Sequence, residues 1–134
     1  MPDSPPTPSD DHTLFGRAIF IIEDHPDSRE MLATALRLVG AQVFVVAHLE
    51  DVQRELDMYL PSLIICDLRL PDGTGVDFIR WLRARDKKTG GAIPCIAVTA
   101  DRVEFPIQGF DGYMRKPVDL AKLCNMAADL IRLR

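Results

Sequence analysis

The sequence has few cysteines, no long apolar run and no excess of basic residues. Its cysteines, Cys66, Cys95 and Cys124, are odd in number and form no CxxC pair, which indicates buried free thiols in a reducing compartment. No apolar stretch approaches the roughly 18 residues of a membrane span, and the N-terminus lacks the basic and then apolar layout of a signal peptide. The formal net charge of −4 argues against nucleic acid as a partner. We therefore expect a cytoplasmic protein that binds neither nucleic acid nor a membrane.

The length and composition of the chain are those of a single domain with a hydrophobic core. It has 134 residues, of which 47% are hydrophobic and 27% charged, as in an ordinary soluble protein. Residues 1–13, MPDSPPTPSDDHT, carry four prolines and three aspartates with almost nothing apolar. This composition predicts a disordered lead-in at 1–13, followed by a single domain over 14–134.

From Phe15 onward, short apolar runs alternate with segments of helical periodicity. The expected strands are RAIFIIE, QVFVV, SLIICD, IPCIAVT and DGYM, and the expected helices cover 26–39, 49–60, 75–85 and 120–131. Pro61 is expected to stop the second helix, and Thr74 with Asp77 forms a capping-box pattern that opens the third. This alternation predicts an α/β fold with a five-stranded, doubly wound parallel sheet and helices on both faces.

Polar side chains stand where the expected strands end. Glu23 and Asp24 follow the first strand, Asp67 ends the third, Thr99 ends the fourth, and Lys116 follows the fifth. Parallel strands present their carboxyl ends at one edge of the sheet, so these groups should meet in a single cleft. Two like charges about 4 Å apart repel by roughly 4 kcal/mol at an effective dielectric near 20, and Mg²⁺ would offset that repulsion. A metal, a lysine and a hydroxyl around a carboxylate nucleophile are the groups that stabilise a phosphoryl group.

The blocks FIIEDHPDSREML, LIICDLRLPDGTG, IAVTA and GYMRKP resemble those of response-regulator receiver domains of two-component signalling. The resemblance runs from about Arg17 to the C-terminus and implies the flavodoxin-like strand order 2-1-3-4-5. It also implies Mg²⁺ as cofactor, a histidine kinase or phosphotransfer protein as phosphoryl donor, and a downstream protein that the sequence does not identify. We expect a stand-alone receiver, monomeric or weakly dimeric, that signals and catalyses only its own phosphorylation and slow dephosphorylation. A fragment of a longer regulator or hybrid kinase is the alternative.

The resemblance also assigns roles to individual residues. Asp67 matches the phosphoacceptor, and the implied metal ligands are Glu23, Asp24, Asp67 and the backbone carbonyl of Arg69. Asp24 matches the direct carboxylate ligand of the acidic pair.

The same comparison implies a group of residues that bind or respond to the phosphoryl group. Thr99 and Lys116 match the hydroxyl and the lysine that bind it, and Tyr113 matches an aromatic switch residue. The Lys116-Pro117 bond matches one that is cis in the family. Structural alternatives remain open for these residues: helix capping for the carboxylates, a strand-end hydroxyl for Thr99, a surface position for Lys116 and plain packing for Tyr113.

Three residues flank the expected site, namely Arg69, Ala100 and Asp101. The small side chain of Ala100 leaves the acceptor open to a phosphodonor. An ion pair between Arg69 and Asp101 would partly cover the cleft and hinder attack by water.

The sequence departs from the family between Thr99 and Lys116, where only 17 positions separate the two residues. Pro106 and Gly109 interrupt the segment ADRVEFPIQGFDG, so we predict that the fourth helix of the family is very short or missing. Our hypothesis is that residues 101–109 form a mobile loop that becomes ordered on phosphorylation. The stretch RARDKKTGGAI is expected to be a solvated basic loop, with a docking patch as the alternative.

Other functions compete with the phosphoacceptor interpretation. A receiver-like protein-binding module that works without phosphorylation is favoured by the shortened fourth helix and opposed by the intact set of site residues. Phosphatases with an aspartate nucleophile have a second aspartate two positions later, where this chain has Arg69. A flavin-binding protein of similar topology would need a phosphate-binding loop after the first strand, and here that loop is acidic.

Overall fold

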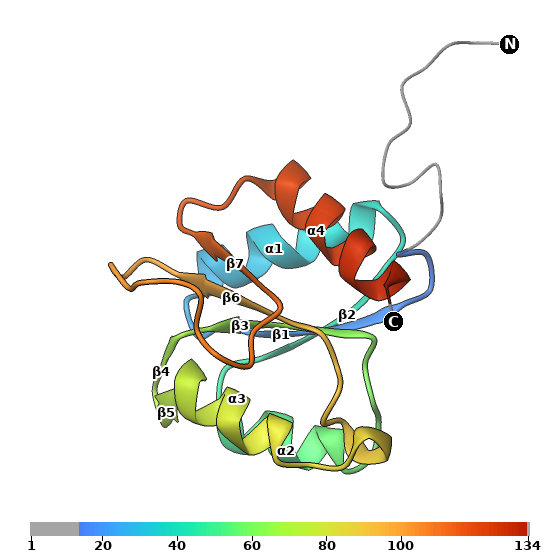
Figure 1. Cartoon of the computed structure of the whole chain (residues 1–134). Coiled ribbons are helices and arrows are strands. Elements are labelled where there is room, and N and C mark those ends of the chain that lie inside the picture. The colour runs from blue at the N-terminus through green and yellow to red at the C-terminus, as the bar shows by residue number, and fades with distance from the viewer. Residues whose placement is uncertain (1–13, 134) are drawn as a thin grey trace, which may run out of the picture.

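The computed structural model describes residues 14–133, so the predicted disorder of residues 1–13 lies outside the described part of the chain. Five parallel strands form one sheet in the order β2-β1-β3-β6-β7, which confirms the predicted topology (Figure 1). Their bounds are β1 (Ala18–Ile22), β2 (Gln42–Val46), β3 (Leu63–Asp67), β6 (Cys95–Thr99) and β7 (Gly112–Arg115). Every residue of β1, β3 and β6 is buried, as expected for central strands that are covered on both faces.

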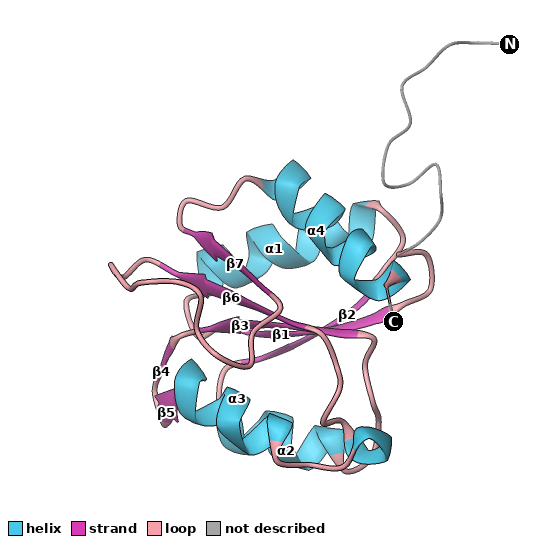
Figure 2. Cartoon of the chain, in the orientation of Figure 1, coloured by secondary structure: helices cyan, strands magenta, loops and turns pink. Residues whose placement is uncertain are grey.

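Helices cover both faces of the sheet (Figure 2). On one face, α1 (Pro26–Leu38) and α4 (Leu120–Arg132) enclose a core with the inward side chains of the central strands. On the other face, α2 (Leu49–Leu56) and α3 (Gly75–Arg83) enclose a second core. All three cysteines are buried and free, as predicted. No helix within residues 14–133 is long and apolar enough to cross a membrane.

Local sequence signals explain several helix ends, and the His25 cap of α1 is one that the sequence did not predict. Proline begins α1, where a missing N–H costs no helical hydrogen bond, and the His25 ring nitrogen Nδ1 accepts from the backbone N–H of Ser28 at 3.3 Å. At the other end of α1, the chain leaves the helix at Gly40, whose φ of +94° favours glycine. At the start of α3, Thr74 Oγ1 accepts from the backbone N–H of Asp77 at 3.1 Å.

Other element ends differ from the sequence prediction. Helix α2 ends at Leu56 instead of residue 60, because the chain passes into turns in which Met58 and Tyr59 both donate to the Glu55 carbonyl. Pro61 disfavours helical geometry at the residue before it, so the helix cannot resume there. Helix α3 likewise ends at Arg83, before the predicted residue 85.

Three short elements have no counterpart in the sequence prediction. Strands β4 (Arg69–Leu70) and β5 (Gly73–Thr74) pair antiparallel, directly after the carboxyl end of β3. The basic stretch after α3 contains a 3-10 helix over Lys87–Thr89. Asp72, in the turn of the β4–β5 hairpin, accepts from the backbone N–H groups of Leu49 and Glu50 and so caps α2.

The crossover from β6 to β7 spans residues 100–111, all of them described, and contains no helix, as predicted. Its second half is fastened to α3 by Arg83, whose guanidinium donates to the Gly109 carbonyl at 2.9 Å and pairs with Asp111 at 2.9 Å. Arg83 also donates to the carbonyls of Gly91 and Ile93. One side chain therefore joins α3, the segment before β6 and the end of the crossover.

The first half of the crossover is fastened to β7. Arg115 donates to the carbonyls of Asp101 and Val103, at 3.3 and 2.6 Å. The rings of Phe105 and Tyr113 stack with their centroids 4.1 Å apart and an angle of 5° between their planes. These contacts give the crossover a defined path, while its predicted ordering on phosphorylation stays a prediction.

We expect that Arg83→Ala lowers the free energy of unfolding by about 2–3 kcal/mol, because three carbonyls and a carboxylate lose their shared donor. Urea denaturation followed by circular dichroism measures this change. Arg80→Ala is the matched control, since Arg80 is exposed on the same helix and makes no ion pair within residues 14–133. The control should shift stability by no more than about 0.5 kcal/mol. Equal losses in the two variants would contradict the fastening role of Arg83.

Candidate functional site

Three carboxylates meet at the carboxyl edge of the sheet. Glu23 and Asp24 follow β1, and Asp67 is the last residue of the neighbouring strand β3. One oxygen from each of the three lies within 4.8 Å of the others. Glu23 and Asp67 are buried, with 1% and 7% of their surface exposed, whereas Asp24 is open to solvent. The sheet topology therefore brings together the acidic residues that the sequence predicted to meet.

Lys116 supplies the cation of this cluster. Its ammonium nitrogen Nζ lies 2.5 Å from Glu23 Oε1 and 3.1 Å from Asp67 Oδ2. The backbone N–H of Lys116 donates to the Thr99 carbonyl at 2.8 Å, which fixes the lysine beside the end of β6. The Lys116-Pro117 bond that follows is cis, the isomer that the family resemblance implies.

Burial and charge act in opposite directions on these groups. Burial raises the pKa of the Glu23 carboxyl, and its contact with Asp67 raises that pKa further, while Lys116 lowers it in part. Burial lowers the pKa of Lys116, but the carboxylates of Glu23 and Asp67 outweigh that effect and leave its pKa raised. The ammonium form of Lys116 is therefore favoured, and it offsets the repulsion between the two buried carboxylates.

Thr99 lines the cleft and is connected to the crossover. The side chain is buried, and its Oγ1 accepts from the backbone N–H of Asp101 at 3.0 Å. Ala100, between them, is exposed beside the cleft, which has a volume of about 390 Å³. A change in the position of the Thr99 hydroxyl must therefore break this hydrogen bond or carry Asp101 with it.

Arg69 and Asp101 form the ion pair that the sequence predicted. The guanidinium nitrogens Nη2 and Nε of Arg69 lie 2.9 and 3.1 Å from Asp101 Oδ2. The backbone N–H of Arg69 donates to Asp67 Oδ1 at 3.0 Å. The effect of this pair on phosphoryl lifetime, and the role of the Arg69 carbonyl as a metal ligand, stay predictions.

Tyr113 lies on an exposed part of β7 and is not among the residues that line the cleft. It is 48% exposed and stacked on Phe105, and the Arg115 guanidinium lies 5.2 Å from the centroid of the Phe105 ring. The sequence did not single out Phe105 or Arg115, because their contacts depend on the path of an irregular segment. It also missed Arg29, which donates to the Glu23 carbonyl at 3.3 Å from the first turns of α1.

The residues present fit a magnesium ion. Carboxylate oxygens are the donors that Mg²⁺ prefers, and the open cleft leaves room for the water ligands that it retains. Both side-chain oxygens of Glu23 accept hydrogen bonds, from Lys116 and from the backbone N–H of His25, and both oxygens of Asp67 also have donors. Asp24 accepts no hydrogen bond from residues 14–133, so its oxygens are the most accessible to a cation.

Three comparisons with known proteins agree on one family. The model of the family described as "Response regulator receiver domain" matches residues 19–128. The KDP operon transcriptional regulatory protein KdpE of Escherichia coli (strain K12) is 36% identical over 110 residues, which cover 78% of this chain and 47% of that protein. An uncharacterized 14.6 kDa protein from the sodA1 3' region of Leptolyngbya boryana is 33% identical over 119 residues, covering 85% of this chain and 89% of that one.

Solved structures show the same architecture. The receiver domain of the sensor histidine kinase PA1611 from Pseudomonas aeruginosa PAO1, which has a magnesium ion coordinated in its active site cleft, is 28% identical with a TM-score of 0.79. The alignment covers 87% of this chain and 98% of that one. The alignment thus covers nearly the full length of the PA1611 receiver domain. By contrast, this chain spans about half the length of the transcriptional regulator KdpE.

We predict that Asp24→Asn weakens Mg²⁺ binding by about tenfold or more, because the most accessible carboxylate loses its charge. Isothermal titration calorimetry with MgCl₂ measures the affinity. Asp27→Asn is the control, since Asp27 is an exposed aspartate in the first turn of α1, outside the cluster. Equal affinity in the wild type and Asp24→Asn would rule out Asp24 as a ligand.

Proposed function

The chain belongs to the response regulator receiver family, and we propose on that premise that Asp67 accepts a phosphoryl group from a histidine kinase or a phosphotransfer protein. The observation that carries the proposal is the placement of the Asp67 carboxylate in an open cleft, hydrogen-bonded to Lys116 and clustered with Glu23 and Asp24. Receiver domains are signalling modules, and the conformational change that follows phosphorylation would control a downstream protein.

In the proposed transfer, an Asp67 carboxylate oxygen attacks the donor phosphorus and forms a new P–O bond. The P–N bond to the donor histidine breaks, and its electron pair stays on the imidazole nitrogen. Lys116, already 3.1 Å from Asp67 Oδ2, is within reach of the oxygens of the incoming group. Bound Mg²⁺, held by Asp24 with Glu23 and Asp67, would add positive charge where the phosphoryl oxygens carry their negative charge.

The signal would leave the site through Thr99. Its hydroxyl now accepts from the Asp101 N–H, so turning that hydroxyl toward a phosphoryl oxygen would alter the start of the β6–β7 crossover. The same crossover carries Phe105, which stacks on Tyr113. The Thr99 hydroxyl and the Tyr113 ring would therefore respond together. Phosphorylation would shift the population between two arrangements of the crossover and β7.

Acetyl phosphate with Mg²⁺ should give a single phosphoryl adduct on the wild-type protein and none on Asp67→Asn. The Asp67 carboxylate can attack phosphorus, whereas the amide that replaces it is not a nucleophile. Intact-mass spectrometry detects the adduct, and a parallel reaction with a chelator should give none. Asp77→Asn changes an exposed carboxylate at the start of α3 and should leave the adduct intact. An adduct that persists in Asp67→Asn would refute the assignment, and no adduct on the wild type would favour a phosphorylation-independent binding module.

The Arg69→Ala variant should lose its phosphoryl group faster, because the pair that partly covers the cleft is gone. An exposed ion pair contributes at most about 1 kcal/mol, so the rate of hydrolysis should rise by no more than about fivefold. The decay of the adduct after removal of acetyl phosphate gives this rate. Arg102→Ala, an exposed neighbour of Asp101, is the control. An unchanged rate in Arg69→Ala would show that the pair does not shield the site.

A further inference from the structure

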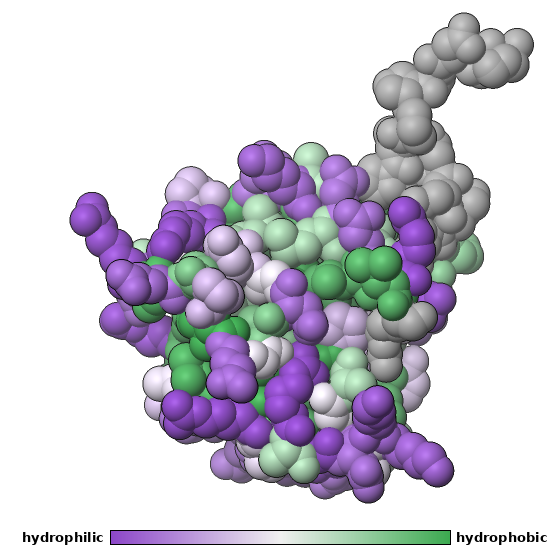
Figure 3. All heavy atoms as spheres, viewed as in Figure 1, coloured by the Kyte–Doolittle hydropathy of each residue, from purple (hydrophilic) through white to green (hydrophobic). Residues whose placement is uncertain are grey.

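We propose that the groove between α3 and the β6–β7 crossover is a docking site for an acidic amphipathic helix of a protein partner. The groove has a volume of about 720 Å³, within the range of pockets that bind ligands. Val76, Ile79 and Ile107 give it an apolar lining, and Arg80 and Arg83 add positive charge. In Figure 3, apolar surface is visible beside α3 and the crossover, framed by hydrophilic side chains.

The crossover approaches α3 closely at Gly109 and so shapes the groove. Gly109 has a φ of +101°, and a side-chain Cβ at this position would lie only 2.8 Å from Ile79 Cγ1. Arg83 holds the same residue through its carbonyl. The wall of the groove at Gly109 is therefore held directly against α3.

The topology leaves space for a helix at this place. A connection between parallel neighbouring strands usually contains a helix that covers the sheet. The crossovers before β2, β3 and β6 each contain one, namely α1, α2 and α3, whereas the crossover before β7 has none within its described residues. On β7, Tyr113 and Arg115 consequently remain exposed. A partner's helix beside α3 would complete the layer.

The charge distribution selects an acidic partner. Residues 80–88 contain five basic residues and one acidic residue, a sum of +4, so the rest of a chain with net charge −4 carries −8. Within this stretch, Arg83 and Arg85 are paired with Asp111 and Asp57. The other three basic residues form no ion pair with residues 14–133. Of these three, Arg80 lines the groove, while Lys87 and Lys88 belong to the 3-10 helix after α3 and do not line it. A carboxylate of a docked helix would supply the counter-charge that Arg80 lacks.

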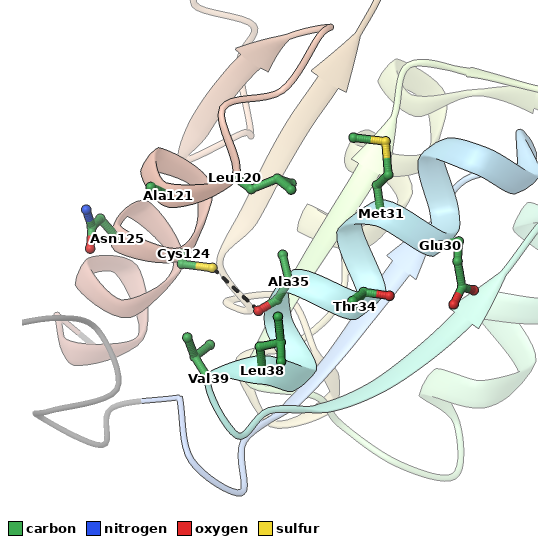
Figure 4. A pocket seen from close by; sticks show the side chains of 10 residues that line it. All are labelled: Glu30, Met31, Thr34, Ala35, Leu38, Val39, Leu120, Ala121, Cys124 and Asn125. Atoms are coloured by element: carbon green, nitrogen blue, oxygen red, sulfur yellow. Dashed lines mark hydrogen bonds between the residues drawn. The ribbon is translucent and has the colours of Figure 1, made fainter.

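Two other possibilities fit the structure less well. The chain's own residues 1–13 carry three aspartates, but Met1 is their only large apolar side chain, so they cannot fill the apolar part of the groove. A second groove, about 590 Å³ in volume, lies between α1 and α4 and is lined by Met31, Leu38 and Leu120 among others (Figure 4). None of the described residues that line this second groove is basic, so the groove gives no reason for an acidic partner.

The proposal rests on residues outside the acidic cluster, so it is tested on the unphosphorylated protein. Two synthetic peptides serve as probes: both repeat leucine at helical spacing, one with glutamate and one with lysine at the remaining positions. Each is titrated into the ¹⁵N-labelled full chain, and amide shifts are followed by NMR. We expect the glutamate peptide to shift residues 76–84 and 107–109 and to bind about tenfold more tightly than the lysine peptide.

Charge reversal then tests the groove itself. Arg80→Glu should lower the affinity for the glutamate peptide by about tenfold and raise the affinity for the lysine peptide. The unfolding midpoint of the Arg80→Glu protein should equal that of the wild type. Ala84→Glu, at another exposed position of the groove, should act in the same direction. The matched control is Arg37→Glu, also in the last turn of a helix but on the opposite face of the sheet.

Several results would overturn the proposal. These are equal affinity for the two peptides, shifts confined to the groove between α1 and α4, or an equal effect of Arg80→Glu and Arg37→Glu. Shifts at residues 76–84 that depend on protein concentration without peptide would assign the groove to a second copy of the chain instead.

Discussion

The bridge that Lys116 makes to Glu23 and Asp67 is the interaction on which the site depends. It joins residues that lie 93 and 49 positions apart in the sequence. Because burial disfavours both carboxylate charges, the cluster needs a counter-charge even without a metal. The parallel sheet provides it by placing the ends of β1, β3 and β7 along one edge. The same ammonium group would later contact a phosphoryl group on Asp67, so one residue serves both stability and the proposed chemistry.

The crossover from β6 to β7 is the second feature on which the proposed function depends, because it connects the site to the surface. Asp101 contacts both Arg69 and Thr99, Phe105 contacts Tyr113, and Gly109 is held by α3. In place of a rigid helix, the chain uses a few side-chain contacts to hold this segment. The absence of a helix also leaves the groove beside α3, so the same feature shapes both the proposed switch and the proposed docking surface.

The sequence was most informative about the strands, which hydrophobic periodicity predicts, and about the side chains at the strand ends, which the parallel sheet brings together. Five short apolar runs predict the sheet, and the polar residues after them predict which side chains meet, since parallel strands share one edge. Periodicity alone failed at Leu60, where a leucine at helical spacing lies beyond the helix because Pro61 follows. The stack of Phe105 on Tyr113 and the role of Arg83 had no sequence signal, because both depend on how an irregular segment folds back.

The most direct test of the account is to identify the phosphorylated atom. Protein treated with acetyl phosphate and Mg²⁺ is reduced with borohydride, which converts an aspartyl phosphate to homoserine, and the peptides are sequenced by mass spectrometry. If Asp67 is the phosphoacceptor, homoserine appears at position 67 and at no other aspartate. Homoserine at position 24, or a phosphate on a histidine with Asp67 unchanged, would contradict it.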